Sequence, residues 1–311
     1  MRGDRLSTLV TEVFVVGGTG RVGSGVVSTL AGPEPPEFDH DGDGDPDLRV
    51  RVASRDPDAA RERFGPGPDV VGFDFERPET WGRALAGVDR LFVTFPPPVG
   101  VRVVREFLDA ARRVGVGHVV LLSVLGAEKL PVLPHRRLER HVERTAPSYA
   151  FLRAAYFMQN LSGVHRPEIV DRDELFVPAG DGSLGFVDAR DVGAAAARAL
   201  AAPARHRNRA YDLTGPESLD FHAVARAFSA VLGRRIEYAD PGRLSFARRT
   251  LARGVEPSLV AFMLAEYEAT RRGLTGRTTD DLARLLGRDP TTVRTFVADH
   301  RERFERRDAA P

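Results

Sequence analysis

The chain of 311 residues contains no cysteine. This absence excludes disulfides, thiolate nucleophiles, iron–sulfur clusters and every zinc site that needs a cysteine ligand. Lysine is almost missing too: of the 45 basic residues only Lys129 is lysine, so 45 − 1 leaves 44 arginines. The 45 basic residues nearly balance 44 acidic ones, and the net charge is +1. Bulk charge therefore predicts no nucleic-acid partner.

Long apolar runs are missing as well. No window approaches 18 uninterrupted apolar residues, and the first ten residues, MRGDRLSTLV, lack an apolar core of secretory length. We therefore expect no membrane partner and a cytoplasmic location. The hydrophobic content of 42%, with 18 Phe, suffices for an ordinary globular core. The length predicts one large domain or two intimate ones.

Strand-like and helix-like segments alternate through the first half of the chain. Apolar, β-rich runs predict strands at 11–16, 48–53, 69–75, 89–94 and 118–123, and the segments between them show helical spacing. Residues 78–86, for example, are predicted to be a helix. Such alternation with short loops predicts an α/β fold, a Rossmann-type doubly wound parallel sheet with helices on both faces.

Three glycines directly follow the first predicted strand. Gly17, Gly20 and Gly23 form G-x-x-G-x-x-G at the start of the first helix, within GGTGRVG. In dinucleotide-binding folds such glycines allow a tight turn, close approach of the backbone to a pyrophosphate, and close helix–strand packing. The alternative is a glycine-rich turn that binds nothing. The dinucleotide is expected to contact Gly17, Thr19, Gly20, Arg21, Val22 and Gly23.

The end of the second predicted strand bears on which dinucleotide is bound. Sites that prefer NAD usually place a carboxylate there, whereas this chain has Ser54 and Arg55. A hydroxyl and a guanidinium suit a 2′-phosphate, so NADP(H) is predicted to be preferred over NAD(H). The alternative is that Arg55 is one surface arginine among many. Further cofactor contacts are predicted at the next two strand ends, with the first two of these residues bracketing the adenine: Asp74, Phe75, Thr94 and Phe95.

An acidic segment rich in proline and glycine, residues 33–47, separates the first helix from the second strand. Its aspartates recur at every second position, as in calcium loops, but no glutamate closes the pattern at the twelfth position. A solvated, mobile insertion is the favoured interpretation, and a calcium site is the alternative.

Segments spread over nearly the whole chain resemble the NmrA-like atypical short-chain dehydrogenases. In order they are GGTGRVG, GVDRLFVTFPPP, HVVLLSVLGAE, FLRAAYFMQN and GFVDARDVG. The branches with ergot-alkaloid-type reductases and NAD(P)H:quinone reductases are the most similar. The resemblance implies an NAD(P)H-dependent oxidoreductase. A related branch, a transcriptional regulator that binds dinucleotide without turnover, supplies the alternative function.

The resemblance also implies a division of the chain into two lobes. Residues 1–155, completed by 186–214, are expected to form the NAD(P)-binding Rossmann domain. Residues 156–185 and 215–305 are expected to form a smaller, mostly helical lobe that binds a small-molecule substrate, and 306–311 a flexible tail. A monomer or homodimer is expected.

The chain departs from ordinary short-chain dehydrogenases at their proton donor. Those enzymes use a tyrosine four residues before a lysine to protonate an alkoxide. Here the only lysine is Lys129, and Leu125 stands at the tyrosine position. We therefore expect acceptors whose charge is delocalised or neutralised on reduction, such as quinones, azo compounds, iminium compounds or flavins.

The resemblance points to three candidate catalytic residues. His135 follows the fifth strand near the place of the missing tyrosine, and an ordinary pKa of about 6.5 suits it to proton donation. The alternative is a solvated helix histidine. Ser123 corresponds to the strand-end serine of the larger family, which bonds nicotinamide or substrate, although it may equally cap a strand. Tyr156 belongs to an aromatic run, with Phe157, Met158 and Asn160, that faces the nicotinamide in the family.

Two further patterns are weaker. His135 and His141 are six residues apart, a poor spacing for one helical face, so no metal site is expected. Residues 278–297 resemble a helix-turn-helix. The same ending is typical of the reductase-like family, however, so DNA binding is the less favoured interpretation.

Overall fold

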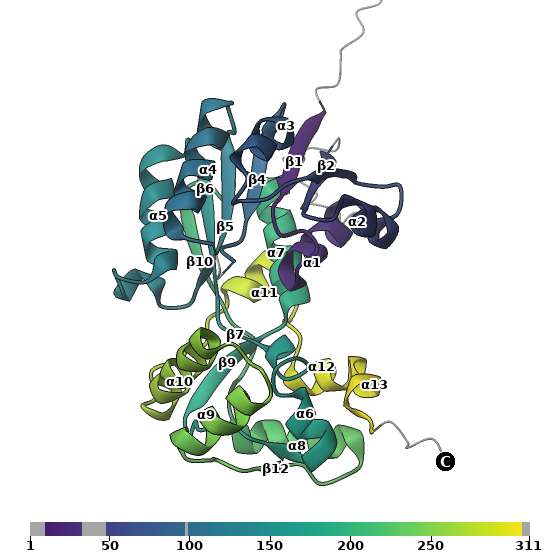
Figure 1. Cartoon of the computed structure of the whole chain (residues 1–311), viewed down its shortest axis with the longest axis vertical. Coiled ribbons are helices and arrows are strands. Elements are labelled where there is room, and N and C mark those ends of the chain that lie inside the picture. Colours follow the sequence, from purple (N-terminus) through teal and green to yellow (C-terminus); the bar gives the residue numbers. More distant parts are fainter. Residues whose placement is uncertain (1–9, 33–47, 97–98, 307–311) are drawn as a thin grey trace, which may run out of the picture. The chain divides into compact units, whose positions relative to one another are not determined.

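The computed structural model describes residues 10–32, 48–96 and 99–306 (Figure 1). The acidic segment at 33–47, with its calcium alternative, lies outside these residues, as does 307–311. The chain divides into two compact units. Unit 1 comprises Met1–Ala154 and Ala189–Asp212, and unit 2 comprises Ala155–Asp188 and Leu213–Pro311. These ranges lie within three residues of the boundaries expected between the two lobes.

Unit 1 is built on a seven-stranded sheet with the order β10-β6-β5-β4-β1-β2-β3. Pairing is parallel from β6 through to β3. The predicted Rossmann-type sheet is therefore confirmed. The chain runs outward from β1 through β2 and β3, then continues at β4 on the other side, and such a switch point is where α/β sheets bind ligands. The strands are β1 (Thr11–Val15), β2 (Leu48–Ser54), β3 (Asp69–Gly72), β4 (Arg90–Val93), β5 (His118–Val124), β6 (Tyr149–Ala154) and β10 (Arg209–Leu213).

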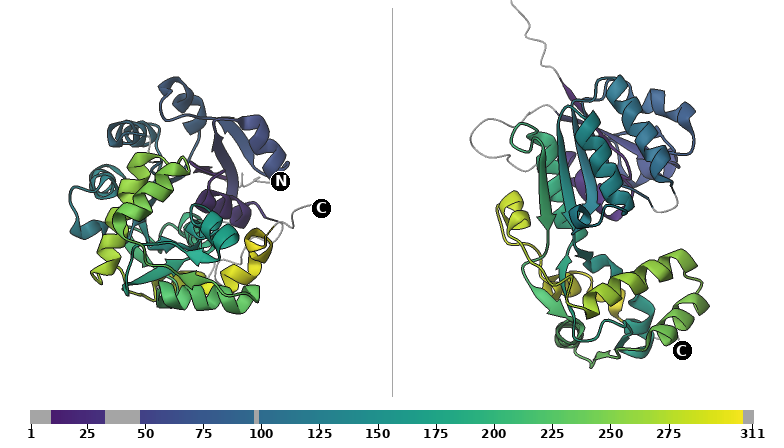
Figure 2. Two further views of the ribbon diagram at one scale, coloured as in Figure 1. Left: turned by 60° about the horizontal axis from the view of Figure 1, so that its bottom comes forward. Right: turned by 90° about the vertical axis from the view of Figure 1, so that its left-hand side faces the viewer.

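Helices cover both faces of this sheet, as the side view in Figure 2 shows. Alternate strand residues such as Phe14, Leu91 and Leu121 belong to one apolar core with Phe107. The intervening residues are also buried, because both faces are covered. The helical elements of unit 1 are α1 (Arg21–Leu30), α2 (Pro57–Phe64), η1 (Pro78–Thr80), α3 (Trp81–Leu85), α4 (Val101–Arg113), η2 (Ala127–Lys129), α5 (Pro134–Thr145) and α7 (Ala189–Ala201).

Two expected elements of unit 1 differ in detail. The third strand ends at Gly72 rather than at residue 75, because the rings of Phe73 and Phe75 turn into the core against Phe107, at centroid distances of 5.1 and 5.3 Å. The helix expected at 78–86 is a 3-10 turn, η1, followed by the short α3.

Unit 2 is mostly helical, as expected, with small sheets formed by β7, β9 and β11 and by β8 and β12. Its core is aromatic and includes Phe221, Phe228, Phe246 and Tyr267. No helix in the described part of the chain is long and apolar enough to span a bilayer. The elements are β7 (Tyr156–Phe157), η3 (Met158–Asn160), α6 (Arg166–Arg172), β8 (Glu174–Leu175), β9 (Ser183–Val187), β11 (Ser218–Asp220), α8 (Phe221–Leu232), β12 (Glu237–Tyr238), α9 (Arg243–Ala252), α10 (Pro257–Arg271), α11 (Asp281–Leu286), α12 (Val293–Asp299) and α13 (Arg301–Phe304).

Helices α1 and α7 pack backbone to backbone where two glycines meet. A Cβ added at Gly193 would lie 2.8 Å from the Cα of Gly25 and 2.9 Å from the carbonyl oxygen of Val22. These are backbone atoms, which cannot move aside as a flexible side chain would. The contact therefore fixes how closely α1 lies against α7.

We predict that Gly193→Ala destabilises the protein by about 1–3 kcal/mol, the usual cost of overpacking. Gly82→Ala is the matched control: Gly82 lies in α3, and a Cβ there meets nothing within 4 Å. It should be neutral or stabilising by about 0.5–1 kcal/mol, because alanine is the better helix former. Urea denaturation of both variants measures the difference. Equal stabilities would contradict the packing argument.

Candidate functional site

The turn between β1 and α1 is a cradle lined by backbone. Gly17 has a φ of +76°, a left-handed conformation that favours glycine, and a Cβ there would lie 2.5 Å from Thr94 Oγ1. A Cβ at Gly23 would lie 2.2 Å from the carbonyl oxygen of Gly17. The amide of Gly20 donates to that same carbonyl at 2.9 Å and closes the turn. The geometry of the turn therefore requires glycine at two of the three expected positions, Gly17 and Gly23.

Helix α1 begins directly after this turn. Its N-cap is Gly20, no side chain caps the helix there, and its first turn has no acidic residue. A helix amino terminus carries partial positive charge and N–H groups without intrahelical partners. The cradle therefore fits a phosphate or pyrophosphate group.

The end of β2 lies beside the cradle and offers one unengaged arginine. Ser54 is buried, and its hydroxyl donates to the carbonyl of Asp56 at 2.7 Å and accepts from the Asp56 amide at 3.1 Å. The hydroxyl proton of Ser54 is thus directed at a backbone carbonyl within the turn. We had expected this hydroxyl to contact the dinucleotide instead. Arg55 is exposed, and its guanidinium has no hydrogen bond or ion pair within the described residues.

A second arginine, Arg63, reaches the cradle from α2. Its Nη1 donates to the carbonyl oxygen of Thr19 at 2.7 Å. Sequence reasoning missed this residue, because the contact joins positions 44 residues apart and Arg63 belongs to no motif. It holds the glycine turn and adds positive charge beside it.

Three further residues predicted to contact the cofactor follow β3 and β4, and they differ in how they are placed. The Oδ1 of Asp74 accepts from the amide of Glu76 at 3.0 Å. The expected contact of Phe75 with an adenine needs correction, because this ring is only 6% exposed and packs in the core against Phe73 and Phe107. Thr94 remains at the cradle, against Gly17.

Phe95 and His135 come together in the structure. Their rings meet edge to face with centroids 5.4 Å apart, although 40 positions separate them. Burial lowers the pKa of His135 below its ordinary value, and the charge of Glu139 opposes that shift. Within the described residues the imidazole has no hydrogen-bond partner. It is therefore a mostly neutral ring at pH 7 that remains able to bond a ligand.

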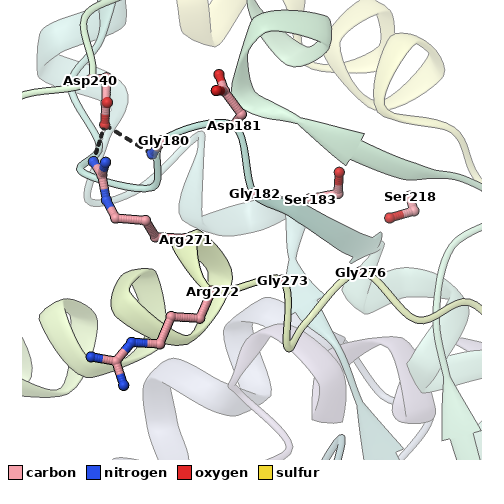
Figure 3. A pocket seen from close by; sticks show the side chains of 10 residues that line it. All are labelled: Gly180, Asp181, Gly182, Ser183, Ser218, Asp240, Arg271, Arg272, Gly273 and Gly276. Carbon is pink, nitrogen blue, oxygen red and sulfur yellow. Dashed lines mark hydrogen bonds and ion pairs between the residues drawn. The ribbon is translucent and has the colours of Figure 1, made fainter.

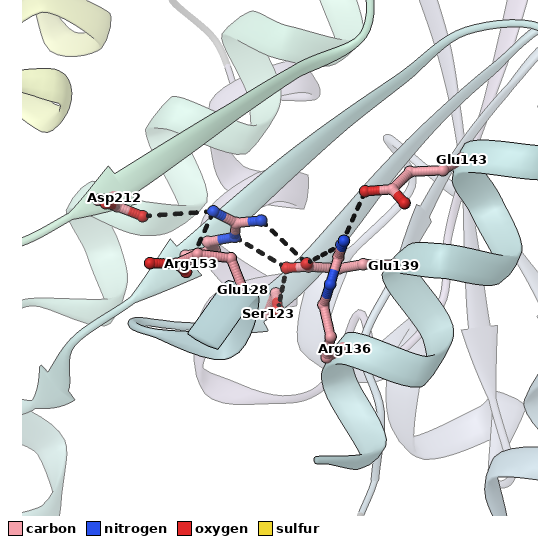
Figure 4. Close-up of polar contacts among 7 residues, drawn as sticks. All are labelled: Ser123, Glu128, Arg136, Glu139, Glu143, Arg153 and Asp212. Atoms are coloured by element: carbon pink, nitrogen blue, oxygen red, sulfur yellow. Dashed lines mark hydrogen bonds and ion pairs between the residues drawn. The ribbon is translucent and has the colours of Figure 1, made fainter. Parts of the chain in front are cut away.

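Ser123, at the end of β5, belongs to a buried polar network (Figure 4). Its hydroxyl donates to Oε1 of Glu139 at 2.7 Å. Glu139 is fully buried and also accepts from Arg153 at 2.9 and 3.0 Å and from Arg136 at 2.9 Å. Burial tends to raise the pKa of Glu139, but these donors outweigh it, so that the pKa is held below its usual value. The carboxylate is ionised.

This network changes the interpretation of Ser123. The side chain is 2% exposed, and its proton is directed at Glu139 rather than at a ligand. Glu139 stands four residues after His135 on α5, which is the spacing that ordinary enzymes use for tyrosine and lysine. Lys129 lies outside this helix, in η2, so the pair four residues apart on α5 is a histidine and a carboxylate.

Tyr156 lies in the core of unit 2. Its hydroxyl is 3.0 Å from Nε2 of His165 and 3.0 Å from the hydroxyl of Tyr267, and these two groups are 2.7 Å apart. Burial lowers the pKa of His165 to about 3, so the ring is neutral. Tyr156 is 5% exposed and its hydroxyl is bonded within unit 2, so the catalytic role expected for it stays a prediction.

A polar pocket of about 760 Å³ also lies in unit 2 (Figure 3). Its lining includes Gly180, Asp181, Asp240, Arg271 and Arg272. Asp240 accepts from Arg271 at 2.6 Å and from the Gly180 amide at 2.9 Å, and Arg272 pairs with Glu268. The pocket leaves little charge for a ligand. No group of three His, Asp or Glu side chains suited to a metal occurs among the described residues.

A family model and several individual proteins match nearly the whole chain or a large part of it. Residues 10–297 match the model of the NmrA-like family. The chain is 31% identical over 297 residues to an NAD(P)H azoreductase of Xenophilus azovorans, covering 94% of this chain and 99% of that protein. It is 31% identical over 211 residues to an agroclavine dehydrogenase of Claviceps fusiformis, covering 65% and 71%.

Solved structures share the fold at lower identity. The triphenylmethane reductase of Citrobacter sp., complexed with NADP(H), has a TM-score of 0.77 at 23% identity, covering 93% of this chain and 99% of that one. NmrA, described as a negative transcriptional regulator in complex with NADP, has a TM-score of 0.69 at 18% identity, covering 93% and 95%.

We predict that Glu139→Gln destabilises the protein by roughly 3 kcal/mol. This is the low end of the range for breaking a buried ion pair, because Arg153 keeps Glu128 at 3.2 Å. The folded pKa of Glu139 lies below the unfolded value of about 4.3, so its contribution is present above that pH and is lost as pH falls through the folded pKa.

Urea denaturation from pH 7 down to pH 3 measures this effect. The stability difference between wild type and Glu139→Gln should shrink below about pH 4.3. Glu143→Gln is the control, because Glu143 contacts the same Arg136 at 2.7 Å from a half-buried position. A Glu143→Gln variant as unstable as Glu139→Gln would contradict the assignment.

Proposed function

Since this chain belongs to the NmrA-like family, we propose that it is an NADPH-dependent oxidoreductase that transfers hydride to a small conjugated acceptor, such as a quinone, an azo compound or an iminium compound. The observation that carries the proposal is the cradle at Gly17 and Gly23, where a Cβ would collide with Thr94 or with the backbone. The family match and the named reductases among its relatives support the reaction class.

The residues at the cradle have distinct proposed roles. The glycine turn and the amino terminus of α1 bind the pyrophosphate. Arg55, which has no protein partner among the described residues, pairs with the 2′-phosphate, and Arg63 fixes the turn through Thr19. When bound, NADPH supplies the hydride. The chain contributes binding, orientation and the exclusion of water.

Proton supply limits the choice of acceptor. We infer that His135 is the proton donor, because this partly buried imidazole lies against Phe95, whereas the hydroxyls of Ser123 and Tyr156 are hydrogen-bonded elsewhere. A neutral imidazole donates a hydrogen bond more readily than a full proton at pH 7. Acceptors that do not build a localised alkoxide are therefore favoured.

A second candidate is a dinucleotide sensor without turnover. The burial of the Ser123 and Tyr156 hydroxyls favours it, because no hydroxyl donor is left at the predicted catalytic positions. Turnover separates the two functions. NADPH oxidation with at least one of a panel of quinones, azo dyes and imines supports the enzyme. Binding of NADPH with no oxidation across the panel supports the sensor.

We predict that Arg55→Ala weakens NADPH binding about tenfold or more and leaves NADH binding unchanged, since a hydrogen bond to a charged group contributes about 1.5–3 kcal/mol. Titration followed by nicotinamide fluorescence measures both affinities. Arg49→Ala is the control, because Arg49 is an exposed arginine near the start of the same strand. Wild-type protein that binds NADPH and NADH equally would contradict the 2′-phosphate assignment.

We predict that His135→Phe lowers kcat with a quinone about 100-fold, the low end for the loss of a proton donor, without changing the Kd for NADPH. Because burial lowers the pKa of His135, wild-type kcat should rise as pH falls below about 6.5, whereas the variant should show no such rise. His222→Phe, at an exposed histidine of α8, is the control. A pH profile that survives in His135→Phe would exclude His135 as the donor.

A further inference from the structure

The segment between β5 and α5 leads directly to His135. It comprises residues 125–133, and α5 begins at Pro134, so that His135 is the second residue of the helix. Leu130 and Val132 in this segment are 52% and 83% exposed. Such exposed apolar side chains contribute little to holding a segment in place, because they bury little surface. Contacts elsewhere in the segment therefore decide where His135 lies.

One arginine of the neighbouring strand β6 binds carboxylates that stand before and after His135 in the chain (Figure 4). Arg153 donates to Glu139 through Nε at 2.9 Å and through Nη2 at 3.0 Å, a contact of fork with fork. Its third nitrogen, Nη1, lies 3.2 Å from Oε2 of Glu128 in η2. Glu128 precedes His135 by seven residues, and Glu139 follows it by four. The guanidinium therefore closes a loop of the chain, from η2 to α5, that contains His135.

This guanidinium is anchored in the sheet of unit 1. The side chain of Arg153 is 12% exposed, and that of Glu139 is fully buried. The hydroxyl of Ser123, at the end of β5, adds a hydrogen bond to Glu139. Asp212 of β10 lies 4.0 Å from the same Nη1 that contacts Glu128. Since β10, β6 and β5 are adjacent strands of one unit, the contacts of this arginine join the sheet to the segment that follows β5.

The strand on the other side of β5 contacts His135 itself. Phe95 follows β4, and its ring meets the imidazole edge to face with centroids 5.4 Å apart. Strands β6, β5 and β4 lie side by side in that order. Arg153 thus fixes the segment from the β6 side, and Phe95 contacts the ring from the β4 side. Orientation matters for a hydrogen-bond donor, because the bond weakens steeply away from the direction of its N–H group.

We propose that Arg153 is a positioning residue for the proposed reaction: by binding Glu128 and Glu139 together, it holds the imidazole of His135 against Phe95 in the orientation that serves proton donation. This inference rests on the proposed function. Arginine suits the role because its planar fork binds one carboxylate with two nitrogens and leaves the third for another. The compact ammonium of a lysine cannot reproduce that fork.

Glu128 allows a test that leaves most of the network in place. Its side chain is 30% exposed, so that a Glu128→Gln variant, which loses the ion pair with Arg153, should lose little folding stability. Glu143 is the matched control, because its side chain is 32% exposed and pairs with Arg136 at 2.7 Å. Glu143 follows His135 by eight residues and lies outside the loop that the guanidinium closes.

The experiment measures three quantities in wild type, Glu128→Gln and Glu143→Gln: kcat with a naphthoquinone, the Kd of NADPH, and the NMR chemical shifts of the His135 ring protons. The signals are assigned by their loss in His135→Phe, and they report ring orientation because the aromatic ring of Phe95 lies so close. We expect Glu128→Gln to shift these signals and to lower kcat about tenfold, since a small misplacement of a reacting group is costly, without changing the Kd of NADPH. Glu143→Gln should behave as wild type.

Arg153→Lys removes the whole fork and should lower kcat at least as much as Glu128→Gln. Urea denaturation of each variant shows how much protein is folded, and kcat is expressed per folded molecule. If Arg153→Lys does not fold, the comparison of Glu128→Gln with Glu143→Gln still decides.

Three results would overturn the inference: unchanged His135 signals in Glu128→Gln, shifted signals with no fall in kcat, or an equal fall in kcat in Glu143→Gln. The NMR measurement keeps the two proposals apart. Wild type that oxidises no NADPH with any acceptor contradicts the proposed enzyme, whereas the His135 signals report the position of the ring without turnover.

Discussion

The close approach of backbone at the first glycine turn is the constraint on which the functional account depends. Side chains at Gly17 or Gly23 would collide with Thr94 or with the turn itself. The space kept clear lies at the start of an uncapped helix and beside the point where the strand order reverses. The roles proposed for Arg55 and Arg63 depend on their position beside this turn. Without the cradle they would be two surface arginines among many.

The range of acceptors that we propose follows from the hydrogen-bond partners of the candidate proton donors. The hydroxyl of Ser123 donates a hydrogen bond to Glu139, and the hydroxyl of Tyr156 lies in a buried cluster with His165 and Tyr267. Both hydroxyls therefore stabilise their own unit. His135 remains as a weak donor. With so few proton donors, the proposed reaction is suited to acceptors that need no proton on reduction.

The sequence predicted the sheet and the cradle because their signals are local. A β-rich run, a glycine turn and a helix lie within about twenty consecutive residues, and each step follows from backbone geometry. Phe75, Ser123 and Tyr156 were placed less well. Their partners Phe107, Glu139 and Tyr267 lie 32, 16 and 111 positions away, and no periodicity connects such pairs. The contact of Arg63 with Thr19 likewise joins residues 44 positions apart, so no local pattern predicts it.

Hydrogen exchange at the glycine turn tests the central claim most directly. Backbone amides of residues 17–23, apart from Gly20, which already donates to Gly17, should exchange more slowly when the protein is saturated with NADPH, because N–H groups of the turn would then be bonded to phosphate oxygens. NADPH that binds at saturation while the exchange of these amides is unchanged would contradict the account.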